Sequence, residues 1–255
     1  MKLLCVSDQI DPLVYSATAK KRFADVSAVL CAGDLPMDYI DFIVSTLNKP
    51  TYFVFGNHNL KEFRYYQKER LASVYPGQNS SSGSELAYLK HHHGAQNAGF
   101  KMFADYNLLM EDPATGRETP LLIAGIPGSR RYNAGLNQYS DAYIKYRLRM
   151  MIPRLISNKI RYGRYLDILL THATPRHIHD LEDPCHKGFE SFNWFIQKYQ
   201  PSYLVHGHIH LYDARIPRIT ETGRTSVVNA FGYHIIELPK PIEEQSKDGE
   251  NSCRH

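Results

Sequence analysis

Short apolar runs that stop abruptly at small or polar residues recur along this chain and constrain its fold more than any other feature. Six runs rich in leucine and β-branched residues occupy residues 2–6, 27–30, 51–55, 121–124, 166–170 and 202–205. Such short, continuous apolar runs are typical of strands buried on both faces. Segments with helical periodicity lie between several of them, at residues 38–47, 141–156 and 189–199. The pattern predicts an α/β domain built from layers of helices and sheets.

The remaining segments predict how the chain closes. Residues 225–229 and 233–238 flank a Phe-Gly pair, which favours a closing hairpin or a pair of strands. Residues 76–84 contain turn formers and hydroxyl residues and predict a surface loop. Because neither an internal repeat nor a linker is evident, we expect one domain over residues 1–242. The polar C-terminal tail at 243–255 is expected to fray.

Composition excludes several classes of protein. The 255 residues include 30 Lys and Arg against 26 Asp and Glu, a net charge of +4, which is ordinary for a globular chain. The charge gives no general argument for a nucleic-acid or acidic membrane partner, although local patches remain open. No apolar stretch reaches the length of a membrane span or a signal peptide. Four dispersed cysteines fit a reducing compartment, so we expect a cytoplasmic protein.

Polar side chains that can bind metals follow five of the predicted strands. The five strand ends run into Ser7-Asp8, Gly33-Asp34, Gly56-Asn57-His58, Thr171-His172 and the segment 206–210. Because ligands bind outside the carboxyl ends of strands in open α/β sheets, these side chains should meet at one edge. Carboxylate, amide oxygen and imidazole suit divalent Mn, Fe, Co, Ni or Zn. Glycines before Asp34, Asn57 and His208 allow sharp turns and close approach to a ligand.

The ordered blocks from Asp8 to His210 resemble a known family pattern. They are similar to the motifs D-x-H, G-D, G-N-H-[DE], H and G-H-x-H of the calcineurin-like metallophosphoesterases. The sequence around these motifs, including THATPRHIHD and the GSRRYN loop, resembles the cyclic-nucleotide-phosphodiesterase-like branch of that family. The resemblance implies a four-layer αββα sandwich with a dinuclear metal centre at the sheet edge. It also implies a metal-dependent phosphoesterase that hydrolyses a phosphodiester with a metal-activated water.

The same resemblance assigns roles to individual residues. Asp34 would bridge two metals, and five further residues would complete the ligand set: Asp8 and His210 on the first metal, and Asn57, His172 and His208 on the second. His58 would lie beside the bound phosphate, where it can stabilise the transition state or protonate the leaving oxygen. One or two divalent ions per chain are implied. Manganese is the expected ion, and Fe, Ni, Co and Zn are the alternatives.

Two positions depart from the family pattern. Ile10 stands where relatives supply a histidine, so the first metal loses one imidazole. Asp11 could replace it as an oxygen ligand, or could form a turn with Pro12, the interpretation that we favour. Asn59 replaces the acidic residue that usually follows G-N-H. These departures motivate an alternative, a noncatalytic metal-binding scaffold that binds a protein partner, as the retromer-associated member of this fold illustrates.

Several other residues are candidates with weaker support. Arg130 and Arg131 follow a predicted strand and could bind substrate phosphate, or could be solvated surface. His179, paired with Asp180, could line the pocket, although a surface loop is the default. Residues 91–93, three histidines, favour a solvated turn. We expect a phosphate-ester substrate, and find no clear nucleic-acid-binding motif and no membrane segment; the protein partner stays unknown.

Overall fold

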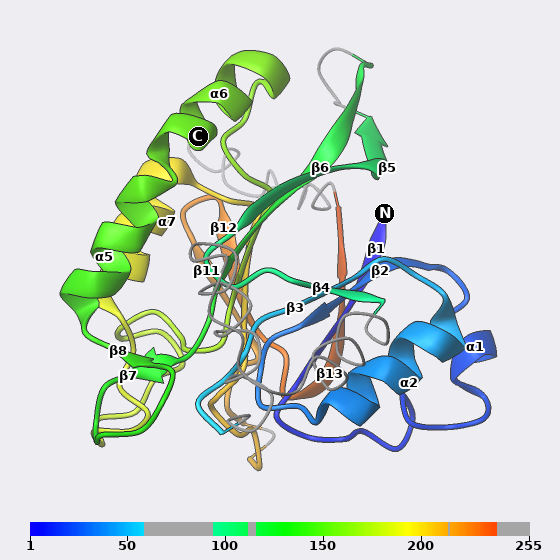
Figure 1. Ribbon diagram of the computed structural model, residues 1–255, viewed down its shortest axis with the longest axis horizontal. Coiled ribbons are helices and arrows are strands. Elements are labelled where there is room, and N and C mark those ends of the chain that lie inside the picture. Colours follow the sequence, from blue (N-terminus) through cyan, green and yellow to red (C-terminus); the bar gives the residue numbers. More distant parts are fainter. Residues whose placement is uncertain (59–93, 112–115, 214, 239–255) are drawn as a thin grey trace, which may run out of the picture.

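Two β-sheets packed face to face form the centre of the molecule (Figure 1). The computed structural model describes residues 1–58, 94–111, 116–213 and 215–238. The predictions for the loop at 76–84, for residues 91–93, for Asn59 and for the tail at 243–255 lie outside these residues. Within the described residues, no helix has the length and apolar character needed to cross a membrane.

The first sheet has five strands, four of them parallel. Its order is β13 (Gly232–Glu237), β1 (Lys2–Ser7), β2 (Val26–Cys31), β3 (Thr51–Phe53) and β4 (Ala95–Asn97). Only β13 runs antiparallel to its neighbour. The helices α1 (Ala19–Arg22) and α2 (Met37–Leu47) lie on its outer face.

The second sheet has six strands with a parallel centre. Its order is β11 (Ile219–Thr222), β12 (Thr225–Asn229), β10 (Tyr203–His206), β9 (Ile168–Thr171), β6 (Glu118–Ile126) and β5 (Met102–Glu111). The edge strands β11 and β5 are antiparallel to their neighbours. Its outer face is covered by α5 (Asp141–Met150), α6 (Ile152–Tyr162) and α7 (Glu190–Tyr199), and the short strands β7 (Ser129–Arg130) and β8 (Gln138–Tyr139) pair separately.

Three separate apolar cores establish four layers. Leu3 and Leu170 belong to the core between the sheets. Leu4, next along β1, packs into the core under α2, and Leu169 packs into the core under α5 to α7. Since neighbouring residues of one strand point to opposite faces, both faces of each central strand are buried. This explains the continuous apolar runs and confirms the predicted αββα arrangement.

Two predictions about the elements are wrong. The single helix at 141–156 is two helices, because Pro153 has no N–H to donate and its ring disfavours a continuous helix; it occupies the first turn of α6 instead. The closing hairpin does not form either. The strand at 225–229 pairs with β10 and β11, whereas β13 pairs with β1 in the other sheet, so the chain changes sheets at Ala230–Phe231.

Candidate metal centre

The carboxyl ends of strands from both sheets meet at one edge, and backbone hydrogen bonds join them. The Asp8 N–H donates to the Gly33 carbonyl at 3.1 Å, and the Gly207 N–H donates to the His172 carbonyl at 3.0 Å. Both carboxylate oxygens of Asp8 accept from the His208 N–H, at 3.0 and 2.9 Å. Loops that are up to 200 residues apart in the chain therefore form one surface.

Three of the side chains at this edge stand on unusual backbone. Asp8, Asp34 and His208 have φ values of 62°, 53° and 68°, which place them in the left-handed region. Residues other than glycine adopt this region rarely and at a cost in energy. The surrounding hydrogen bonds hold these turns in place, and each turn brings a polar side chain to the sheet edge directly after a buried strand.

Glycines beside these side chains allow them to pack tightly. A Cβ atom on Gly56 would overlap the Asp34 carboxylate, and one on Gly207 would overlap the Asp8 carboxylate. A Cβ atom on Gly33 would overlap the His172 ring. The three positions thus require glycine for space, and at Gly33 the φ of 98° requires it as well.

Lone pairs from three side chains converge at His172. Its Nδ1 donates to the Ala32 carbonyl at 2.8 Å, so in the neutral ring Nε2 carries the lone pair. That Nε2 lies 3.2 Å from Asp34 Oδ2 and 3.1 Å from Asn57 Oδ1, both acceptors. The Asn57 amide nitrogen contacts the Tyr132 hydroxyl at 3.4 Å, which supports this orientation of the amide. Because all three atoms present lone pairs, they repel one another unless a proton on Nε2 or a bound cation lies between them.

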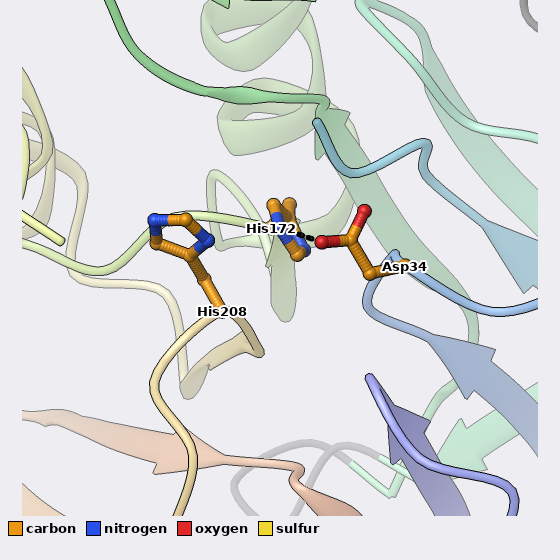
Figure 2. A group of neighbouring side chains, drawn as sticks. All are labelled: Asp34, His172 and His208. Atoms are coloured by element: carbon orange, nitrogen blue, oxygen red, sulfur yellow. Dashed lines mark ion pairs between the residues drawn. The ribbon is translucent and has the colours of Figure 1, made fainter. Parts of the chain in front are cut away.

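His208 completes a group that fits a divalent ion. Its Nε2 donates to the Cys185 carbonyl at 2.7 Å, which leaves the Nδ1 lone pair available. One ligand atom each from Asp34, His172 and His208 lies within 4.8 Å of the other two. Figure 2 shows His208 on one side of His172 and the Asp34 carboxylate on the other. Carboxylate with two imidazoles is a donor set for first-row divalent metals.

The side chains of the site share one proton, held mainly by His172. Burial lowers the pKa of His172, but the Asp34 carboxylate beside it outweighs burial and raises that pKa to about 9. Burial raises the pKa of Asp34, yet the His172 charge and the bonds from His172 and the His58 N–H bring it below its ordinary value. Burial and the His172 charge lower the pKa of His208 to about 3. A cation binding here displaces the His172 proton.

Comparison with known proteins identifies the family of this chain. The family model described as calcineurin-like phosphoesterase matches residues 1–212. The chain belongs to this family. Its members are metal-dependent phosphoesterases, which agrees with the donor set at the sheet edge. No curated protein matches the sequence.

Solved structures share the calcineurin-like phosphoesterase fold at low sequence identity. TT1561 of Thermus thermophilus is 15% identical, with 91% of this chain and 89% of that chain covered and a TM-score of 0.55. Another solved chain is 14% identical, with 93% and 95% covered and a TM-score of 0.58. A Vps29 single mutant from Entamoeba histolytica is 11% identical, with 90% of this chain and 73% of that chain covered, and has a TM-score of only 0.34.

The part of this edge that contains Asp8 and His210 is more open. The His210 Nε2 lies 3.9 Å from Asp8 Oδ1, and its Nδ1 bonds the Tyr212 hydroxyl at 2.8 Å. Ile10, which stands in the place of the family histidine, is 44% exposed. The Asp11 carboxylate accepts from the Leu13 N–H at 2.8 Å, which is the local turn that the sequence favours.

Of the candidate substrate residues, only His58 has a hydrogen bond to a residue of the site among the described contacts. The His58 N–H donates to Asp34 Oδ1 at 2.9 Å, and the His58 side chain is exposed. Arg130 donates to the Gly188 carbonyl at 3.3 Å, and Arg131 is exposed. Tyr132, which the sequence reasoning missed, lies in the same loop and reaches Asn57. Its position directly after the two arginines was the available signal.

His179 does not pair with Asp180, which corrects that prediction. Asp180 binds Arg176 at 2.5 Å, whereas the His179 Nδ1 bonds His206 Nε2 at 2.9 Å and its Nε2 bonds the Thr220 hydroxyl at 2.8 Å. The His206 Nδ1 donates to the Gly207 carbonyl, so its Nε2 must accept from His179, and Thr220 must donate to His179. Burial lowers the pKa of His179 to about 4, so His179 is neutral at neutral pH, as this series of hydrogen bonds requires.

The loop before α7 approaches the site, which is the less favoured of the two interpretations that the sequence leaves open for His186, a pocket-lining residue or a surface loop. Asp183, Cys185 and His186 form a second group of potential ligand atoms. The His186 Nδ1 lies 2.9 Å from Asp183 Oδ1, and the His186 ring lies 5.3 Å from that of His208, centroid to centroid. Since His208 also donates to the Cys185 carbonyl, this loop supports the site directly.

Proposed function

We propose that the protein is a metal-dependent phosphodiesterase that acts at the edge formed by Asp34, His172 and His208. The convergence of acceptor atoms on His172 Nε2 carries this proposal, because such an arrangement is unfavourable unless a positive charge occupies it. Membership in the calcineurin-like phosphoesterase family supplies the reaction class. The preference for a diester, and for the cyclic-nucleotide-phosphodiesterase-like branch, rests on the sequence motifs.

Six side chains would hold two metals in this proposal. Asp34 would bridge them, Asp8 and His210 would face the first, and Asn57, His172 and His208 would face the second. A divalent ion bound there would polarise the ester and lower the pKa of a water molecule. Manganese is the ion that we propose. Because the family histidine is replaced by Ile10, the first position should bind its metal more weakly than the second.

The protein's own groups would orient the substrate and move the proton. The bond from the His58 N–H to Asp34 fixes the start of the loop beside the bridging carboxylate. The exposed His58 ring could then donate a proton to the departing alcohol oxygen. Arg130 and Arg131 would approach the phosphate from the neighbouring loop, where a guanidinium can form paired hydrogen bonds with its oxygens.

Hydrolysis of bis(p-nitrophenyl) phosphate, compared with that of p-nitrophenyl phosphate, tests this function. We expect turnover with added Mn, and a preference for the diester. Asp34→Ala should abolish turnover and reduce the metal content of the purified protein. His58→Ala should reduce turnover about 100-fold or more while leaving metal content unchanged.

A metal-binding scaffold is the competing outcome, and exposed Ile10 motivates it. It predicts no hydrolysis of either ester with Mn, Ni, Co, Fe or Zn, although the metal is bound. The scaffold would also keep its protein partner after Asp34→Ala. Metal content and turnover measured on the same preparations therefore separate the two functions.

A further inference from the structure

The segment that forms α5 and α6 carries an uninterrupted positive charge. Between Asp141 and Asp167 the chain has no acidic residue and seven basic ones: Lys145, Arg147, Arg149, Arg154, Lys159, Arg161 and Arg164. The whole chain has a net charge of only +4, so the net charge of this short segment exceeds that of the entire protein.

Three of these cations have neither a counter-charge nor an aromatic or hydrogen-bonding partner in the described part of the chain. Arg164 pairs with Asp167 at 2.6 Å, and Arg147 lies 3.8 Å from the centre of the Phe100 ring. By contrast, Arg149, Arg154 and Arg161 are exposed, and no carboxylate of the described residues forms an ion pair with them. Their guanidinium groups remain available to an anionic partner.

An apolar stripe runs along the same helices on their outer side. Tyr146 and Met150 on α5 are exposed, as are Pro153, Ile156 and Ile160 on α6; within each helix they are spaced three or four residues apart, so each helix contributes one exposed apolar side to the stripe. Met150 is 63% exposed and Ile160 is 79% exposed. The inward face of the helices is separately apolar, through buried residues such as Leu148 and Leu155. Packing within the fold therefore explains why the inner face is apolar, but it does not explain the exposed apolar stripe.

The stripe lies on the outside of the molecule. Figure 1 shows α5 and α6 running end to end along the outer side of the six-stranded sheet, with no other described element beyond them. We call the five stripe residues together with Arg149, Arg154 and Arg161 the basic-apolar face.

The chemistry of the basic-apolar face discriminates between partners. A second copy of the chain would bring two strongly positive segments together, which like-charge repulsion opposes. A nucleic acid would use the arginines but would leave Met150, Ile156 and Ile160 without a role. An anionic lipid surface uses both, because its phosphates attract the arginines and its acyl region accepts the aliphatic side chains.

We propose that the basic-apolar face binds the surface of membranes that contain anionic phospholipid. Arg149, Arg154 and Arg161 would contact the headgroup phosphates with their guanidinium groups. Met150, Ile156 and Ile160 would insert between the headgroups, with α5 and α6 lying in the plane of the interface. This inference goes beyond the proposed phosphodiesterase function and does not depend on it.

Vesicle co-sedimentation of the full chain tests the proposal. Binding is expected to vesicles of phosphatidylcholine mixed with phosphatidylserine, to be negligible with phosphatidylcholine alone, and to weaken as salt is added. Replacing both Arg154 and Arg161 by Gln should lower the partition coefficient about 25-fold, roughly fivefold per cation. Replacing both Ile156 and Ile160 by Ser should lower it about 10-fold or more.

Matched variants elsewhere on the surface serve as controls. Lys20→Gln with Lys21→Gln on α1 removes the same charge, and Ile216→Ser with Ile219→Ser, before and on β11, removes two exposed isoleucines; both double variants should leave binding unchanged. Equal losses in these controls, or no binding to anionic vesicles, would overturn the proposal. Duplex DNA binding that needs the arginines but not the isoleucines would assign the face to nucleic acid instead. A dimer that the isoleucine variant disrupts would assign it to a second copy.

Discussion

His172 is the residue on which the candidate site depends. It is completely buried, yet its Nε2 faces the oxygens of Asp34 and Asn57. Because Nδ1 already donates its proton to the Ala32 carbonyl, the additional proton that the ring needs without a metal must lie on Nε2. The neighbouring glycines give the ring and the Asp34 carboxylate the space to approach one another.

The stability of the metal-free protein should depend on this proton. The pKa of His172 in the folded state is raised from 6.5 to about 9. Its contribution is complete below pH 6.5 and is lost as the pH rises through 9, a loss of about 3 kcal/mol at most. Urea unfolding of chelator-treated protein across this range measures the effect. The same slope in His172→Gln would contradict the assignment.

Gly56→Ala should weaken the site without changing any candidate ligand. The added methyl group overlaps the Asp34 carboxylate, so we expect metal affinity to fall about 10- to 100-fold, as for other changes that misplace a ligand. Gly163→Ala is the control away from the site: its Cβ would meet no atom within 4 Å, and because its φ of 75° makes the substitution costly for the fold, metal affinity and not stability is compared. Isothermal titration with Mn measures both variants, and equal affinities for the two would refute this account.

At the scale of elements, loops hold the ends of the strands in place. The turn after β10 carries both His208 and His210. Hydrogen bonds from Thr220 to His179 and from His179 to His206 support this turn from the side. The loop before α7 supports it from another direction, through the Cys185 carbonyl. These loop contacts are non-local, and no periodicity in the sequence predicts them.

His179→Ala should therefore destabilise the turn after β10. It leaves the completely buried His206 Nε2 without a donor, which costs about 1–3 kcal/mol. Metal affinity should fall as well, because His206 adjoins the Gly207-His208 turn. His177→Ala, at an exposed position in the same loop, should leave the free energy of unfolding unchanged. Denaturant unfolding and metal titration of both variants check this. Similar behaviour of the two variants would contradict a supporting role for the hydrogen bond from His179 to His206.

At the scale of the whole molecule, the candidate centre joins the two sheets. Asp34 and Asn57 follow strands of the five-stranded sheet, whereas His172 and His208 follow strands of the six-stranded sheet. A metal held by both sets would oppose their separation, in addition to the apolar core between the sheets. Binding at this edge should therefore be coupled to global stability.

Removal of the metal should lower the melting temperature. At a free metal concentration of about 100 times the dissociation constant, binding stabilises the fold by about 2.7 kcal/mol, which corresponds to roughly 5–10 °C for a domain of this size. Differential scanning calorimetry with and without chelator measures the shift. Asp34→Ala should show none, and a shift of equal size in that variant would place the metal elsewhere.

The sequence by itself determined the central layers and the composition of the edge. Continuous apolar runs specify strands with two buried faces, and polar residues after those strands must gather where parallel strands end. The same reasoning missed α1, β4, β5 and β11, because short or edge elements with exposed polar positions carry weak periodicity.

Only the tertiary structure decided which atoms meet. The strands at 225–229 and 233–238 enter different sheets, because pairing depends on partners far along the chain. His179 contacts His206 rather than its neighbour Asp180 for the same reason. Local pattern specifies which way a residue faces, whereas side-chain orientation at the site follows from packing and hydrogen bonds between distant segments. The apolar stripe on α5 and α6 likewise became evident only once the opposite face was seen to fill the core.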